Sequence, residues 1–199
     1  MSREYEHATE HELETTWSLY AHASDNDYQS NIIFIGKVDT IESFWRLYNN
    51  IPRLNMMFKS DSTTYCNGRV INGLSFFRND ILPEWEDIHN IDGSEWCWRG
   101  TLEESKLNKI WDELLLRCIG EYFENVNGIR VVYKPKTIKH DMQQKVEIWM
   151  PPAVDESKDL RLLNECLIDH YLVFNHVLHT VQKRYSGKKN RPLVKKNIN

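Results

Sequence analysis

The sequence has few cysteines, no long apolar stretch and no internal repeat, and each absence excludes a class of protein. Its four cysteines in 199 residues stand 21 to 48 positions apart without a CxxC pair, which argues against a zinc site and a disulfide-rich scaffold. No apolar run exceeds four residues, as in Ile32–Ile35, whereas a membrane-spanning helix needs about 20. The first residues lack the apolar core of a secretory signal, so reduced thiols and a cytoplasmic or nuclear location are expected.

Sequence motifs of several enzyme classes are also missing. The chain has no GxxxxGK[ST] phosphate loop, no GxSxG elbow, no HExxH pair and no glycine-rich dinucleotide fingerprint. His170, His176 and His179 stand near one another but lack cysteine or acidic ligands at a matching spacing, so a metal site is not expected. We therefore expect a binding protein without catalytic residues or cofactors, and not an enzyme.

Charge is distributed unevenly along the chain, which has 25 basic and 29 acidic residues and a net charge of −4. Seven basic residues and no acidic residue follow position 182, which leaves 18 basic against 29 acidic before it. An acidic body argues against broad non-specific binding to nucleic acid, while a local phosphate contact stays compatible with it. Because no linker-like stretch divides the chain, we expect a flexible N-terminal arm over 1–10 and one domain over 11–199 with a basic C-terminal segment over 183–199.

Three segments have the pattern of amphipathic helices. The first begins at a capping-box-like Asp39–Glu42 and ends before Pro52. The second, about 104–123, carries one apolar stripe at spacings of three and four, and Leu116 lies outside that stripe. Its members are Leu107, Ile110, Trp111, Leu114, Leu115, Cys118, Ile119 and Tyr122. The third helix is predicted over about 155–171.

Short strands are predicted between these helices. Their ranges are 31–38, 76–77, 95–99, 128–134 and 146–149. Within 95–99, alternation places Trp96 and Trp98 on one face and the charged residues on the other. The segment 175–181 fits either a helix or a strand. Strands interrupted by separate helices favour an α+β fold with an antiparallel sheet.

Seven tryptophans are the unusual feature of the composition, and one of them stands in an unusual setting. Trp85 follows closely after Pro83 and directly precedes the carboxylates Glu86 and Asp87. Such a loop can present an aromatic face beside a pair of hydrogen-bond acceptors. The alternative is a tryptophan that anchors the loop on the sheet and leaves the acids in solvent.

Several segments, taken in order, resemble the eukaryotic translation initiation factor 4E family, which binds the mRNA cap, and mark the chain as a divergent member. The matching segments are Asp39–Ile51, Phe77–Asp87, Ile110–Glu121, Lys145–Trp149 and Lys189–Arg191. The resemblance covers about residues 11–150 well and the remainder loosely. It implies a curved antiparallel β-sheet with three helices on its convex face and the cap on the concave side. It also implies that 175–183 is a strand.

The ligand implied by the resemblance is the 7-methylguanosine triphosphate cap of mRNA. Methylation gives the base a positive charge, which suits it to stacking between two aromatic rings. Trp85 matches one stacking position and Tyr28 the other, with Tyr20 as the alternative to Tyr28. Glu86 matches the carboxylate that accepts hydrogen bonds from guanine N1 and N2. Trp149 matches the methyl contact, and its alternative is a core residue that ends a strand.

The resemblance also implies a set of cations for the cap phosphates. The candidates are Lys134 and Lys145, with Lys136, Lys139 and Lys188 as further lysines nearby. Glu95 stands where the family often has an arginine. Phosphate binding is therefore expected to be weaker, or to depend on the lysines and the basic segment.

The convex face is implied to bind a 4G-type scaffold, or a repressor that mimics it, through a docked helix. The matching positions are His11, Leu13, Ile41, Trp45, Glu113, Leu116 and Gly120. Periodicity agrees independently for Leu116, which has no place in the core stripe. Glu12 and Asp112 stand where a proline and an apolar residue are usual, which favours a divergent scaffold or a 4E-binding repressor.

Three functions stay open at this point. The expected one is a cap-binding initiation factor that links capped mRNA to a scaffold. The second is a cap-binding translational repressor, or an isoform with a non-standard partner. The third is an aromatic-cage reader of another methylated cation, which the lysines and Glu86 disfavour because a peptide cage needs no phosphate grip. Neither DNA nor a membrane is expected as a partner.

Overall fold

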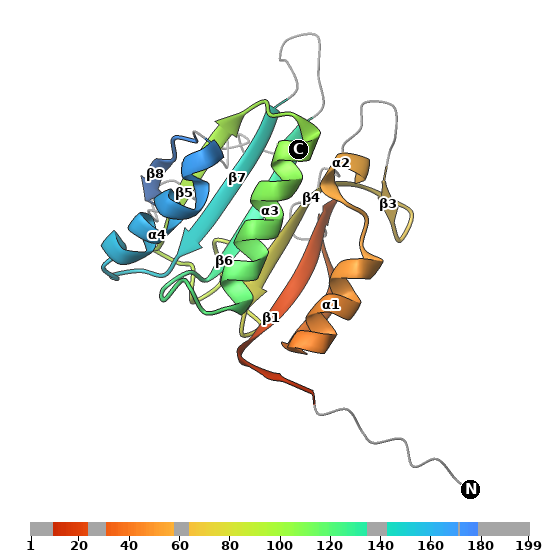
Figure 1. Cartoon of the computed structure of the whole chain (residues 1–199), viewed down its shortest axis with the longest axis horizontal. Coiled ribbons are helices and arrows are strands. Elements are labelled where there is room, and N and C mark those ends of the chain that lie inside the picture. Colours follow the sequence, from red (N-terminus) through yellow and green to blue (C-terminus); the bar gives the residue numbers. More distant parts are fainter. Residues whose placement is uncertain (1–9, 24–30, 58–63, 135–142, 171, 179–199) are drawn as a thin grey trace, which may run out of the picture.

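An antiparallel sheet forms the centre of the protein, and the helices cover one of its faces (Figure 1). The computed structural model describes residues 10–23, 31–57, 64–134, 143–170 and 172–178. The expected N-terminal arm, apart from Glu10, and the basic segment 183–199 lie outside this part of the chain. The expected fold is confirmed: a curved antiparallel sheet carries three main helices on its convex side.

Within the described residues the sheet has eight strands, and all of their pairings are antiparallel. They are β1 (Glu12–Ala23), β2 (Ile32–Thr40), β3 (Tyr65–Cys66), β4 (Arg69–Arg78), β5 (Ser94–Gly100), β6 (Gly128–Lys134), β7 (Gln143–Met150) and β8 (Asn175–Leu178). Their order is β2-β1-β4-β6-β7-β5-β8, and β3 pairs with β4. The strand implied over 175–183 is therefore present as far as Leu178, and its remaining residues lie outside the described chain.

The helices begin and end close to the predicted positions. They are α1 (Ile41–Asn50), α3 (Glu104–Ile119) and α4 (Ser157–Leu167), which a 3-10 turn (Ile168–His170) follows. A further single turn, α2 (Leu54–Met57), was not predicted. The expected capping box at Asp39–Glu42 was placed one residue early. Thr40 Oγ1 instead accepts from the backbone N–H of Ser43 at 3.0 Å, and the Ser43 hydroxyl accepts from the N–H of Thr40 at 2.9 Å.

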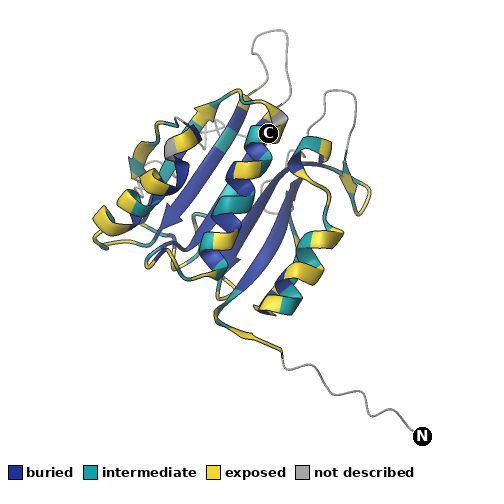
Figure 2. Cartoon of the chain, viewed as in Figure 1, coloured by how far each residue is buried: buried dark blue, intermediate teal, exposed yellow. Residues whose placement is uncertain are grey.

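The core lies between the sheet and the helix layer, where Figure 2 shows continuous burial along the central strands. Trp17 on β1 stacks on Phe76 of β4 with ring centroids 5.1 Å apart. The predicted stripe of α3 is buried from Leu107 to Cys118, but Tyr122 is exposed because the helix ends at Ile119. Among the described residues, no helix is both long and apolar enough to cross a membrane.

Candidate functional site

The concave side of the sheet faces away from the helices, and we call this surface the open face. Its side chains come from alternate positions of β1, β4, β6, β7 and β5. One end of it is aromatic: Tyr20, Phe77 and Trp149 form a buried cluster against which Trp85 packs. Phe77 and Trp149 meet edge to face at 5.4 Å, and Trp85 meets Trp149 at 6.1 Å. Gly128 makes this packing possible, since a Cβ there would lie 2.3 Å from the Phe77 ring.

Trp149 is only 1% exposed, because Trp85 and its neighbours cover it. The contact of Trp149 with the methyl group of a cap stays a prediction. Tyr20 is also buried, and its ring lies 5.8 Å from Phe34. It belongs to the open face, whereas Trp17 lies in the core on the other side of the sheet.

Hydrogen bonds hold the loop that carries Trp85 in place. Asp87 accepts from the backbone N–H groups of Leu82 and His89, both at 2.9 Å. Burial alone would raise the pKa of Asp87, but these bonds outweigh it and hold the pKa below its usual value. Glu86, by contrast, is exposed. The two neighbouring carboxylates therefore differ in role: Asp87 shapes the loop, and Glu86 faces the solvent beside Trp85.

The middle of the open face holds a buried ionic cluster. Lys145 Nζ lies 2.9 Å from Glu95 Oε1 and also contacts Glu147. The side chains of Glu95 and Glu147 are 2% and 3% exposed. Burial alone would lower the pKa of Lys145, yet the two carboxylates raise it, so this lysine is charged. Arg130 Nη1 lies 3.6 Å from Glu147, which completes the cluster.

A pocket of about 210 Å³ adjoins this cluster. Its cationic lining residues are Arg99, Arg130, Lys134 and Lys145. Strand register explains the grouping, because Arg130 faces Glu147 across β6 and β7 while Arg99 faces Lys145 across β5 and β7. Sequence reasoning missed both arginines. Alternation along the strands contained the signal, since Arg99 shares a face with Glu95 and Arg130 shares one with Lys134.

The opposite, helix-covered side carries a second surface, which we call the α1–α3 patch. Ile41, Trp45 and Leu116 are 42%, 40% and 45% exposed there. The N-terminal end of β1 is tied to α1, because Glu42 accepts hydrogen bonds from His11 Nδ1 at 2.7 Å and its backbone N–H at 2.9 Å. These bonds lower the pKa of Glu42 to about 2.

Asp112 and Glu113 of α3 both have partners inside the protein. Asp112 accepts a hydrogen bond from the Tyr48 hydroxyl at 2.6 Å and binds Arg53 at 2.9 Å. The charge at position 112 is therefore neutralised locally. Glu113 lies beside α4, with His170 Nε2 at 3.5 Å and the Cys166 thiol at 3.6 Å.

Comparison with known proteins identifies this architecture. The family model "Eukaryotic initiation factor 4E" matches residues 12–191. The chain belongs to the eukaryotic initiation factor 4E family.

Two curated initiation factors 4E from Homo sapiens illustrate the relationship. Eukaryotic translation initiation factor 4E is 34% identical over 124 residues, which is 60% of this chain and 52% of the relative. The type 1B factor is 32% identical over 155 residues, which is 74% of this chain and 57% of the relative. The chain spans about half the length of the curated relatives it matches.

Two solved structures of the initiation factor 4E family align over most of the chain. Caenorhabditis elegans eIF4E-3 with the 4E-binding protein Mextli and cap analog has a TM-score of 0.69 and 25% identity, covering 90% of this chain and 97% of that one. Ascaris suum eIF4E-3 with the m2,2,7G cap has a TM-score of 0.67 and 26% identity, covering 87% and 93%.

Not every site residue expected from the 4E resemblance lies within the described chain. Tyr28, Lys136, Lys139 and Lys188 fall outside it. Of the others, Trp85, Glu86, Trp149, Lys134 and Lys145 share the open face or its rim. The partner positions His11, Leu13, Ile41, Trp45, Leu116 and Gly120 lie on the helix side, together with Glu113 at the α4 end of that surface.

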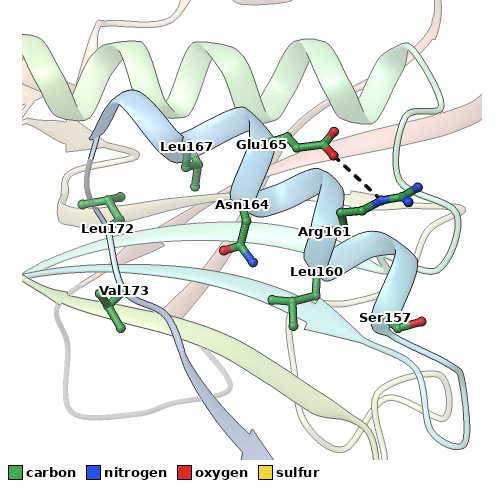
Figure 3. A pocket seen from close by; sticks show the side chains of 8 residues that line it. All are labelled: Ser157, Leu160, Arg161, Asn164, Glu165, Leu167, Leu172 and Val173. Atoms are coloured by element: carbon green, nitrogen blue, oxygen red, sulfur yellow. Dashed lines mark ion pairs between the residues drawn. The ribbon is translucent and has the colours of Figure 1, made fainter.

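A larger hollow of about 640 Å³ lies beside α4 (Figure 3). Leu160 and Leu167 line it from the helix, and Leu172 and Val173 line it from the segment before β8. None of the residues predicted from the sequence contributes to it.

Proposed function

We propose that the open face binds the 7-methylguanosine cap of mRNA and that the α1–α3 patch binds a 4G-type scaffold or a 4E-binding protein. The chain would then act in the cytoplasm as an initiation factor that bridges capped mRNA and its partner without catalysing a reaction. Family membership supports this proposal, as do the eIF4E-3 relatives solved with cap and with Mextli.

The observation that carries the proposal is the order of groups along the open face. An indole and an exposed carboxylate stand at one end, in Trp85 and Glu86, and cations line a pocket further along the same strands. Trp149 and Lys145 are four residues apart on β7, or about 13 Å at a strand rise of about 3.3 Å per residue. That span suits a guanosine whose base stacks at the aromatic end and whose phosphates extend toward the cations.

Each group has a chemical reason to favour this ligand over others. A methylated, positively charged base gains a cation–π contact with Trp85 that an unmethylated base lacks. The Glu86 carboxylate can accept two hydrogen bonds from the N1 and N2 groups of guanine, which adenine does not offer. Together these contacts select methylated guanine, and the cations favour a phosphorylated ligand.

Partner binding rests on a separate observation. Three apolar side chains on two neighbouring helices are exposed, and a patch of this kind marks docking sites for partner helices. Because Arg53 already neutralises Asp112, which also accepts a hydrogen bond from Tyr48, this carboxylate leaves the apolar patch usable by a partner helix. Glu12 is exposed at the start of β1, so a partner with a basic residue nearby would fit better than one with an acidic residue.

Calorimetric titration of the full chain with 7-methylguanosine triphosphate and with GTP, at one salt concentration, tests the cap proposal. A desolvated cation–π contact worth about 2 kcal/mol predicts roughly 30-fold preference for the methylated nucleotide. Equal binding of the two nucleotides would refute recognition of the cap. Capture of a 4G-type scaffold that supports translation would then separate an initiation factor from a repressor.

A further inference from the structure

We infer that the terminal phosphates of the ligand bind Arg99, Arg130 and Lys134, and that Lys145 is a structural counter-ion to two buried glutamates. This inference rests on the proposed function, and it adds to that function by assigning the phosphate contacts to different residues. The family resemblance pointed to Lys145 for that role and to neither arginine.

The charge on Lys145 is already compensated. Its ammonium group contacts Glu95 and Glu147, two carboxylates that are almost fully removed from water. If Lys145 moved toward a phosphate, both buried carboxylates would lose their lysine counter-ion. Breaking a buried ion pair in this way is strongly unfavourable. Lys145 is therefore held in the sheet by its partners.

Arg130 is placed differently. Its Nη1 is 3.6 Å from Glu147, which is longer than a charge-assisted hydrogen bond of about 2.7–2.9 Å. Its Nε is buried and has no hydrogen-bond partner among the described groups. A buried guanidinium donor without an acceptor is costly, and a phosphate oxygen entering the pocket would satisfy it.

Arg99 and Lys134 add further positive charge to the lining of the pocket. Neither forms an ion pair with any residue in the described part of the chain. Arg99 lies beside Cys97, whose thiol stays neutral because burial raises its pKa. With four cations lining the pocket against Glu95 and Glu147, two positive charges remain in excess, which suits a polyphosphate.

The test compares affinities for 7-methylguanosine triphosphate and 7-methylguanosine monophosphate by calorimetry. Arg99→Gln and Arg130→Gln are each expected to weaken triphosphate binding about tenfold. The monophosphate affinity should change by about twofold or less, because the removed charge acts on the distal phosphates. Arg161→Gln removes the same charge from an exposed site on α4 and should alter neither affinity.

A double variant, Glu95→Gln with Lys145→Gln, isolates the role of Lys145. It removes one charge of each sign, so the net charge of the cluster is unchanged, and the triphosphate affinity should stay within about threefold. Thermal melting of each variant verifies that it is folded. Loss of affinity in this folded double variant, or full retention in both arginine variants, would overturn the inference.

The same titrations separate this inference from the proposed function. If the parent chain prefers the methylated over the unmethylated triphosphate and both arginine variants bind normally, only the proposed phosphate contacts are refuted. Equal binding of both triphosphates with losses in both arginine variants would support these phosphate contacts and refute recognition of the methylated base. Binding of neither nucleotide to the parent chain would refute both.

Discussion

Glu147 accepts a hydrogen bond from the indole N–H of Trp149 at 3.0 Å. The other oxygen of the same carboxylate contacts Lys145, so one side chain joins the aromatic and the ionic ends of the open face. Replacing Glu147 with leucine removes this acceptor of the Trp149 N–H and one carboxylate from Lys145 and Arg130. We expect a loss of about 3–5 kcal/mol in the free energy of unfolding, measured by chemical denaturation.

Glu147→Gln is the matched control, because its amide oxygen can still accept from Trp149 while the negative charge is gone. It should be less destabilising than Glu147→Leu. Equal losses in the two variants would mean that the bond to Trp149 contributes nothing to stability.

Trp85→Ala should weaken binding of 7-methylguanosine triphosphate by about 1–3 kcal/mol, or roughly 5- to 150-fold. The loss follows from removal of the accessible aromatic ring at the end of the open face. Calorimetry measures it, and Trp98→Phe on the helix-facing side of β5 serves as a control that should bind normally. Unchanged affinity in Trp85→Ala would exclude stacking on this residue.

Glu86→Gln should weaken nucleotide binding, whereas Asp87→Asn should lower stability, although the two residues are neighbours. Glu86 is exposed, so its variant should keep its stability and bind the methylated guanine nucleotide about tenfold more weakly. Asp87 holds the loop through two backbone N–H groups, so its variant should be less stable by about 1–3 kcal/mol. Denaturation and titration of both variants distinguish the roles, and a reversed pattern would contradict the assignment.

Trp45→Ala and Leu116→Ala should abolish partner capture while leaving cap affinity intact, because these exposed side chains lie on the side of the sheet opposite to the cap site. Each residue is more than a third exposed, so the cost in stability should stay below the roughly 3–5 kcal/mol of truncating a fully buried tryptophan. Pulldown with a 4E-binding peptide measures capture. Simultaneous loss of cap binding and stability would identify Trp45 as a core residue.

Tyr48 should ionise late on alkaline titration. Burial, with the adjacent Asp112, raises its pKa to about 12 from an ordinary 10.0. Because the folded-state pKa is the higher one, this contribution to stability is complete below about pH 10 and disappears as the pH rises toward 12. Tyrosinate absorbance and denaturation across this range, compared in the parent chain and Tyr48→Phe, test the shift. Parallel pH profiles of stability for the two proteins would contradict it.

Periodicity predicted the helices better than the strands. The stripe of α3 is determined locally, because one face of a single helix meets the core. β1 was not predicted at all, since its alternation is blurred. Tyr20 and His22 point to the open face but are buried there, and the His22 ring meets the Ser75 hydroxyl at 2.8 Å. A strand covered on both faces loses the contrast between polar and apolar positions.

The site was predictable where it depends on neighbours in sequence and unpredictable where it depends on register. Trp85 and Glu86 are adjacent, so their common loop was evident from the chain. The ionic cluster joins Glu95, Arg130 and Lys145 from three strands, and no local pattern specifies which residues face one another. The partner of Asp112 was similarly unpredictable, because Arg53 comes from outside α3.

Trp45 and Trp85 lie on opposite sides of one sheet, and this placement gives the molecule two internal optical reporters. Indoles buried in the core between the sheet and the helices, such as Trp17 and Trp111, supply a constant background emission at short wavelength. A base stacked on Trp85 would quench emission without shifting it, whereas an apolar helix over Trp45 would shift emission to the blue. Occupancy of the two faces would then be distinguishable in a single unlabelled sample, and their order of binding could be followed in time.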